Sequence, residues 1–393
     1  MLQLQEPRKS GPIALFNLGF RPFFLLGALF ALLLIGHWLP AFQSGWTPAH
    51  YQLGLYWHGH EMLFGFAFAI IAGFLLTAVR TWTQVQTPFG WTLGGLVALW
   101  LAARLLPFIP GTPALLLVVI DLAFAPLVAL GIGIPIVRSG NYRNLMFLPM
   151  MLGFFVANLL VHLQLLGITE NSLMSGLYLA LYLSIAVITV IGGRVIPFFT
   201  ERGLGGDTQC TRYPWLEKSI LPLTFLWLLA QFWPGGYIAM ALSALLGVAN
   251  LVRLAGWWQP KLWRYPLVWI LHAGYLFVGL GCLLQVAAFF ELASHSIAVH
   301  AFTVGAIGGL TLGMMARVSL GHTGRPLTVT RLIQLAFVLM MLSALSRISV
   351  GLLPLEQMQL LHISGGFWML AWLLFLLRYL PILLKPRVDG LWG

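Results

Sequence analysis

The chain contains 393 residues, of which 60% are hydrophobic and only 8% carry a charge. About a quarter of the residues in soluble domains are charged, so this composition excludes a soluble globular protein and predicts a polytopic membrane protein. The formal net charge of +11 would suit a nucleic-acid partner, but the positions of the charges indicate membrane orientation instead, and we expect no nucleic-acid binding.

Long apolar runs separated by proline, glycine or charged residues predict about twelve transmembrane spans. We expect helices, because a helix is the only open-chain structure that satisfies its own backbone hydrogen bonds in lipid. The fold class is therefore all-α, a polytopic transmembrane helix bundle that forms a single domain over residues 1–393. The predicted spans cover roughly residues 15–40, 58–79, 91–107, 113–137, 144–167, 174–197, 217–234, 236–255, 266–290, 297–318, 330–353 and 357–381.

The basic residues indicate how these spans are oriented. If the N-terminus is cytoplasmic, all of the 21 Lys and Arg residues except Arg104 and Arg347 fall on or near the inner side, beginning with Arg8 and Lys9. This asymmetry fixes the parity of the helix count, because one miscounted span would place basic loops outside. We therefore predict that both termini are cytoplasmic.

The sequence contains a candidate internal repeat. His60 matches His300, and two glycines that follow His60 match two that follow His300, at an offset of 300 − 60 = 240 residues. We predict parallel repeats over about residues 15–137 and 266–381, which flank a central block of spans five to eight. Chance similarity between helices rich in Gly and Ala is the alternative.

Eight of the ten histidines fall at the predicted outer ends of spans or in outer loops, and His272 is one of the two exceptions. Neutral imidazole is a good ligand for copper, iron and zinc, so this clustering predicts metal or haem coordination. The alternative is that histidine is simply tolerated in the headgroup region. The candidate ligands are His60, His300, His58, His162, His37, His362 and His272.

Helix geometry divides these candidates. At about 100° per residue, His58 and His60 point to nearly opposite faces of one helix, so they are not expected to share a metal. We assign His60 and His300 to one site, and His58 to a second metal or an adjacent haem. Glu61 is the candidate proton carrier, or a partner that fixes the tautomer of a ligating imidazole.

Other polar residues within the spans need partners. Asn158 and His162 are four residues apart and lie on one helix face, whereas Asp121 lies deep in an apolar span and is expected to pair with Arg104. Three basic residues near the inner side are candidates for binding haem propionates, with simple helix anchoring as the alternative: Arg194, Arg317 and Arg325. Because there is no Cys-x-x-Cys-His motif, any haem would be held by coordination alone.

Several motifs together resemble the NnrS family, from the first span to the last. They are residues 19–24, 57–65, 72–79, 192–200, 300–306 and 317–325. The segment Arg80–Gln84 departs from the Pro-Asn-Trp-Thr-Gly expected there. The resemblance implies a multi-pass protein of the bacterial inner membrane that contains haem b and copper, is made in response to nitric oxide, and is associated with denitrification and nitrosative stress.

The function expected from these observations is binding and reduction of nitric oxide, a nitric oxide reductase-type oxidoreductase activity. Nitric oxide is small and apolar and reaches such a site through membrane lipid. Electrons would come from an external donor or from quinone. The alternative is a haem or copper transporter or insertion factor that protects or repairs nitric oxide-sensitive enzymes, since repeats and intramembrane glycines also suit a moving carrier.

Overall fold

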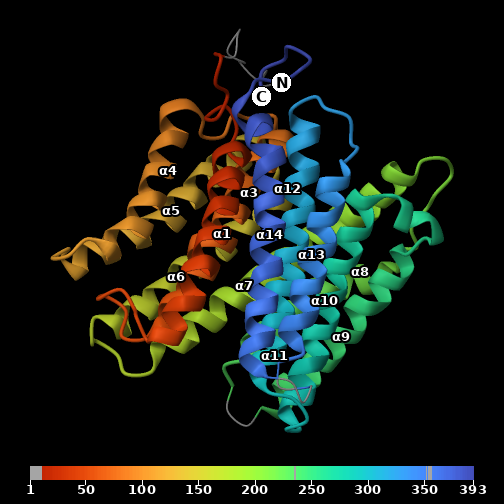
Figure 1. Ribbon diagram of the computed structural model, residues 1–393. Coiled ribbons are helices and arrows are strands. Elements are labelled where there is room, and N and C mark those ends of the chain that lie inside the picture. Colours follow the sequence, from red (N-terminus) through yellow and green to blue (C-terminus); the bar gives the residue numbers. More distant parts are fainter. Residues whose placement is uncertain (1–10, 234–235, 351, 353–355) are drawn as a thin grey trace. The chain divides into compact units, whose positions relative to one another are not determined.

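The computed structural model describes residues 11–233, 236–350, 352 and 356–393, and this part of the chain contains helices and no strands (Figure 1). Arg8 and Lys9 lie outside the described residues. Within the described residues, eleven helical segments are long and apolar enough to cross a membrane. A twelfth, α8 (Pro214–Ala230), has 17 residues and corresponds to the predicted span 217–234. The prediction of an all-α polytopic bundle is confirmed.

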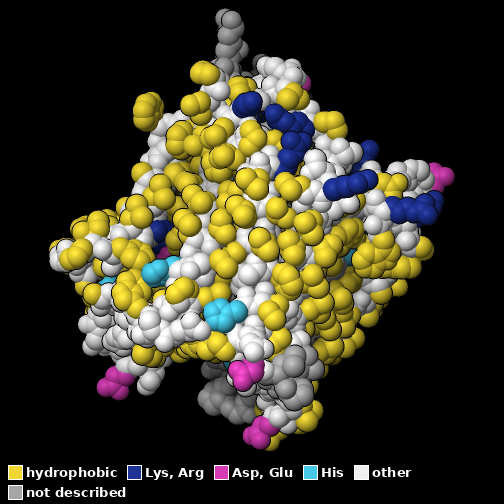
Figure 2. Space-filling model, in the orientation of Figure 1, with side chains coloured by type: hydrophobic (Ala, Val, Ile, Leu, Met, Phe, Trp, Pro, Cys, Tyr) yellow, Lys and Arg dark blue, Asp and Glu magenta, His cyan; other side chains and the backbone are white. Residues whose placement is uncertain are grey.

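The remaining elements follow the predicted order. They are α1 (Phe20–Ser44), α2 (Gly54–His60), η1 (Glu61–Ala67), α3 (Phe68–Thr83), α4 (Gly90–Leu105), η2 (Leu106–Phe108), α5 (Ala114–Ser139), η3 (Tyr142–Asn144), α6 (Phe147–Leu165), α7 (Ser172–Leu204), α9 (Tyr237–Trp257), η4 (Pro260–Arg264), α10 (Pro266–Phe289), α11 (His295–His300), η5 (Ala301–Gly308), α12 (Gly309–His322), α13 (Arg331–Ile348) and α14 (Gln357–Leu384). Hydrophobic side chains cover most of the face seen in Figure 2, as expected for a surface that contacts lipid.

The chain divides into two compact units. The first comprises residues 1–180, 318–326 and 375–393, and the second comprises residues 181–317 and 327–374. Helices α7, α12 and α14 therefore contribute residues to both units.

Arg21 fixes the first helix of the first unit to the end of the last helix. Its guanidinium is fully buried and donates hydrogen bonds to the carbonyl oxygens of Ile382, Leu383 and Lys385, at 3.3, 2.8 and 2.9 Å. The last carbonyls of a helix have no partner within the helix, so a buried arginine satisfies groups that would otherwise be costly in an apolar environment. This role explains the arginine in the motif at residues 19–24.

Arg253 holds four helices of the second unit together. Its guanidinium pairs with both carboxylate oxygens of Glu217, at 2.9 and 2.8 Å, and donates to Tyr275 Oη at 2.6 Å and to the carbonyl oxygen of Thr189 at 3.3 Å. A side chain at Gly193 would collide with this guanidinium. The absence of a side chain at Gly193, in the motif at residues 192–200, therefore permits the close approach of this guanidinium.

Two π-helical segments lie in equivalent positions of the two candidate repeats. The segment η1 begins directly after His60, and η5 begins directly after His300. A π-helix hydrogen-bonds each residue to the fifth along the chain, is rare in proteins, and is frequent at functional sites. The two histidines therefore share a rare backbone environment, while the repeat itself stays a prediction.

Candidate metal centre

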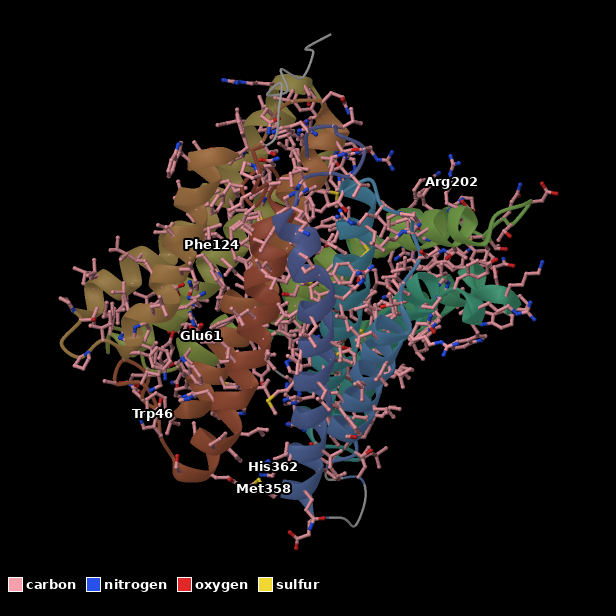
Figure 3. The ribbon with its side chains drawn as sticks, turned by 45° about the horizontal axis from the view of Figure 1, so that its top comes forward. Trp46, Glu61, Phe124, Arg202, Met358 and His362 are labelled. Carbon is pink, nitrogen blue, oxygen red and sulfur yellow. The ribbon has the colours of Figure 1, made fainter. Side chains whose placement is uncertain are left out.

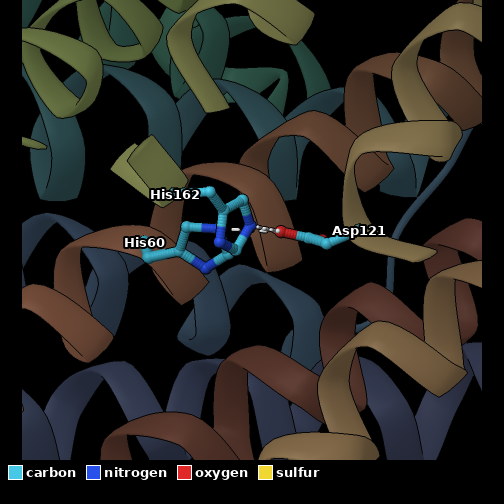
Figure 4. Close-up of side chains that lie close together, drawn as sticks. All are labelled: His60, Asp121 and His162. Atoms are coloured by element: carbon cyan, nitrogen blue, oxygen red, sulfur yellow. Dashed lines mark hydrogen bonds and ion pairs between the residues drawn. The ribbon is translucent and has the colours of Figure 1, made fainter. Parts of the chain in front are cut away.

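Three buried side chains of the first unit converge between α2, α5 and α6. His60 is the last residue of α2, Asp121 lies in the first third of α5, and His162 lies near the end of α6. One ligand atom from each lies within 4.8 Å of the other two, and Figure 4 shows the two imidazoles facing the carboxylate. Asp121 Oδ2 is 3.0 Å from His60 Nε2 and 2.9 Å from His162 Nε2.

Two further charged residues complete a buried network around this constellation. Glu61 Oε1 is 2.9 Å from His60 Nδ1, and Glu61 Oε2 is 2.8 Å from Arg104 Nε. Arg104 also forms an ion pair with Asp121 through Nη2, which confirms the predicted Arg104–Asp121 pair. The guanidinium therefore bridges the two acids that flank His60.

Gly65 leaves the space that this bridge requires. A Cβ atom at Gly65 would lie 2.8 Å from Glu61 Oε2 and 3.1 Å from Arg104 Cδ. The carbonyl oxygen of Gly65 accepts a hydrogen bond from Trp100 Nε1 at 3.0 Å. Gly65 lies within η1, so the π-helical segment both follows the histidine and accommodates its charged neighbours.

The charges in this network do not cancel unless another positive charge is present. Glu61 and Asp121 supply two carboxylates and Arg104 supplies one guanidinium, and all three are at least nine-tenths buried. A buried charge without a partner is strongly unfavourable. A protonated imidazole or a bound cation would balance the network, so the site suits a cation.

Polar side chains hold the two imidazoles in place. Asn158 Nδ2 donates to Asp121 Oδ2 at 2.9 Å, and Asn158 Oδ1 is 2.9 Å from His60 Nε2. Tyr51 Oη lies 2.8 Å from His60 Nδ1. Asn158 and His162 therefore do lie on one face of α6, as predicted, and both contact Asp121.

The loop before α2 supplies His50 and Tyr51 to the same network. His50 Nε2 lies 3.5 Å from His162 Nδ1. Burial, together with the nearby imidazoles of His162 and His60, lowers the pKa of His50 to about 4, so His50 is neutral at pH 7. Burial and the charges of Glu61 and Asp121 raise the pKa of Tyr51 well above its usual value, so its hydroxyl stays protonated.

The other predicted ligands of the first unit contact aromatic rings. His37 meets the rings of Trp46 and Trp57 nearly edge-on, with centroids 4.7 and 5.3 Å away. His58 stacks on Trp38 at 4.4 Å with an interplanar angle of 7°. His58 and His60 thus have different surroundings, in agreement with the prediction that they point to different faces.

The remaining candidate ligands belong to the second unit. His300 Nδ1 donates to the carbonyl oxygen of Ser296 at 2.7 Å, which puts the lone pair of a neutral imidazole on Nε2. Both ring nitrogens of His272 face backbone carbonyl oxygens, at 3.1 and 3.4 Å, an arrangement that suits a structural histidine. His362 is exposed on α14, one turn from Met358 (Figure 3). His60 and His300 lie in different units, and their sharing of one cofactor region stays a prediction.

The three candidate propionate partners have different surroundings. Arg317 is 6% exposed and its guanidinium lies over the ring of Phe199 at 3.9 Å. Arg194 is partly buried in α7, and Arg325 Nη1 donates to the carbonyl oxygen of Thr323 at 3.4 Å. His300 and Arg317 are 17 residues apart on one continuous helical segment, a separation of about 25 Å. They are therefore too far apart to hold the same haem.

Sequence reasoning missed His50 and Tyr51, and it did not foresee the contact of Asp121 with the two histidines. Tyr51 and His50 lie in the loop before α2, and a loop has no regular periodicity from which side-chain positions can be predicted. Asp121 was expected only as the partner of Arg104. The one usable signal was the pair Asn158 and His162, whose shared helix face needed a polar partner in an apolar bundle.

The comparison with known proteins agrees with the resemblance in the motifs. No curated protein matches the chain. The family model described as "NnrS protein" matches residues 14–387, nearly the whole chain. This match fits a membrane protein of the nitric oxide response. The chain, with its buried His–Asp–His constellation inside a polytopic helical bundle, belongs to the NnrS family.

Proposed function

We propose that this protein binds nitric oxide and reduces it with copper and haem b, in the bacterial inner membrane. The observation that carries the proposal is the buried constellation of His60, Asp121 and His162. Three ligand atoms within 4.8 Å of one another, in a buried network of two carboxylates and one guanidinium, are an unusual feature inside an apolar bundle.

The donor set fits copper. Two imidazoles and a carboxylate are the N and O ligands that Cu(II) accepts, although zinc also accepts them. Ligating imidazoles usually have their second nitrogen held by another polar group, which fixes the ring. Here Glu61 and Tyr51 contact Nδ1 of His60.

The second unit offers a residue that fits a haem. In many haem proteins the axial histidine donates its Nδ1 hydrogen to a neighbouring acceptor and binds iron through Nε2. His300 has this arrangement, with the Ser296 carbonyl as the acceptor. Arg347, which donates to the Ser296 hydroxyl at 3.3 Å, is better placed than Arg317 to bind a propionate of a haem at His300. When bound, haem would supply iron that stores an electron and binds nitric oxide.

Residues of the first unit would deliver protons and balance the charges of the site. Conversion of two nitric oxide molecules to nitrous oxide and water consumes two electrons and two protons. Glu61 is the proposed proton carrier, since its carboxylate lies between His60 Nδ1 and Arg104 Nε. Arg104 keeps both acids in position beside His60. The electrons would come from an external donor or quinone, and nitric oxide would arrive through lipid.

Metal analysis and anaerobic turnover of the purified protein test the proposal. We expect copper, a haem Soret band, and nitrous oxide production when the reduced protein is mixed with nitric oxide. His60→Ala should remove copper and turnover, and His300→Ala should alter the haem spectrum. The matched control is His322→Ala, because His322 lies at the other end of the helical segment that contains His300. Copper and haem without nitrous oxide would favour a transporter or insertion factor, and absence of both cofactors would refute the proposal.

A further inference from the structure

Among the residues that the structure describes, one member of the buried network is partly exposed. His60, Glu61, Arg104, Asp121, Asn158, His162 and Tyr51 are all buried, whereas His50 is partly exposed. A cation that reaches the constellation from water must shed hydration on the way, so a donor at the surface lowers the barrier. His50 is the side chain of this network in position to be that donor.

His50 is held in this position by the structure of its loop. The Tyr51 backbone N–H donates to the carbonyl oxygen of Pro48 at 2.9 Å, and the Thr47 hydroxyl donates to the carbonyl oxygen of Tyr51 at 3.3 Å. These bonds close the loop on itself just before α2. Tyr51 is anchored on His60, so its neighbour His50 lies against His162.

The two ring nitrogens of His162 face different residues, one toward His50 and the other toward Asp121. Its Nδ1 lies 3.5 Å from His50 Nε2, and its Nε2 lies 2.9 Å from Asp121 Oδ2. The imidazoles of His162 and His60 follow each other with ring centroids 5.5 Å apart, and those of His50 and His162 with centroids 5.7 Å apart. Three imidazoles therefore form a series of closely spaced donors from the partly exposed loop to the buried constellation.

We propose that His50 is the loading residue for the copper site: it binds an arriving Cu(II) ion transiently and transfers it to His162, without being a ligand in the final complex. This inference rests on the proposed copper site. A residue that acts only on the path changes the rates of binding and release by the same factor, because the equilibrium affinity does not depend on the path.

The experiment compares rates with equilibrium affinity in the full-length protein in detergent. Metal-free protein is mixed rapidly with Cu(II)–glycine, and binding is followed by quenching of tryptophan fluorescence and by freeze-quench EPR. Release is followed after addition of excess EDTA, and equilibrium dialysis gives the stoichiometry and Kd. The variants are His50→Ala and His50→Asn, which keeps a polar side chain in the loop. His295→Ala, an exposed histidine of the second unit, is the matched control.

We expect both His50 variants to slow loading and release in parallel by about tenfold or more, which corresponds to roughly 1.4 kcal/mol in the barrier. Stoichiometry and Kd should stay at the values of the unmodified protein and of His295→Ala. A weaker Kd or a lost copper ion would make His50 an equilibrium ligand and overturn the inference, and so would unchanged rates. If the unmodified protein binds no copper, the proposed copper site itself fails, which is a distinct result.

Discussion

Removal of Arg104 should destabilise the protein strongly, because its guanidinium pairs with both acids of the metal-site network. Arg104→Ala would leave Glu61 and Asp121 buried with only imidazole as a counterion. Breaking a buried ion pair by removing one partner typically costs about 3–5 kcal/mol. We expect a loss of this size in the free energy of unfolding.

The measurement is unfolding in mixed micelles as the fraction of denaturing detergent rises, with metal-free protein. Arg212→Ala is the control, because Arg212 pairs with Glu201 on an exposed surface, where such pairs contribute about 0–1 kcal/mol. The double variant Arg104→Met with Asp121→Asn removes one charge of each sign, and we expect it to be at least about 1 kcal/mol more stable than the sum of the single variants implies. If Arg104→Ala costs no more than Arg212→Ala, the described network is not a buried charge cluster and the reasoning fails.

Three further predictions concern other parts of the chain. Gly65→Ala would place a Cβ 2.8 Å from a carboxylate oxygen, and it should lower the free energy of unfolding by about 1–3 kcal/mol in the same assay. Gly94→Ala, where the space is open, should instead stabilise its helix by up to about 1 kcal/mol. Equal effects of the two substitutions would contradict this. Arg21→Ala should lower the free energy of unfolding by about 1.5–3 kcal/mol per lost hydrogen bond, and proteolysis near the end of α14 should accelerate; an unchanged cleavage rate would argue against the anchoring role. Burial and a nearby carboxylate raise the pKa of Cys210 to about 11, so the thiol is protonated at neutral pH and the thiolate gains as pH rises. Its alkylation by iodoacetamide, measured by mass spectrometry, should therefore keep accelerating above pH 9, and a plateau near pH 9 would contradict the shift.

Features of the fold that depend on amino-acid composition and on helical periodicity could be predicted from the sequence. Hydropathy locates the long helices, because burial in lipid demands long apolar segments. The Arg104–Asp121 pair followed from the cost of an isolated charge in an apolar helix. The shared face of Asn158 and His162 followed from helical periodicity alone.

Other features depend on contacts that no local pattern encodes. The π-helical segments after His60 and His300 add residues to a turn and so rotate the faces that follow, which invalidates angles counted at 100° per residue. Asp121 joins two histidines because three helices pack together, which sequence spacing does not reveal. His50 belongs to the network only because its loop closes on itself.

Arg21 has a consequence for the order in which the chain is assembled. Its guanidinium enters the membrane region with the first helix, but the carbonyl groups that satisfy it belong to residues 382–385 and are synthesised last. The first unit also draws on residues 318–326 and 375–393. During biosynthesis the guanidinium of Arg21 must therefore be solvated or paired with lipid until α14 has been synthesised. Only then can the hydrogen bonds that complete the first unit form.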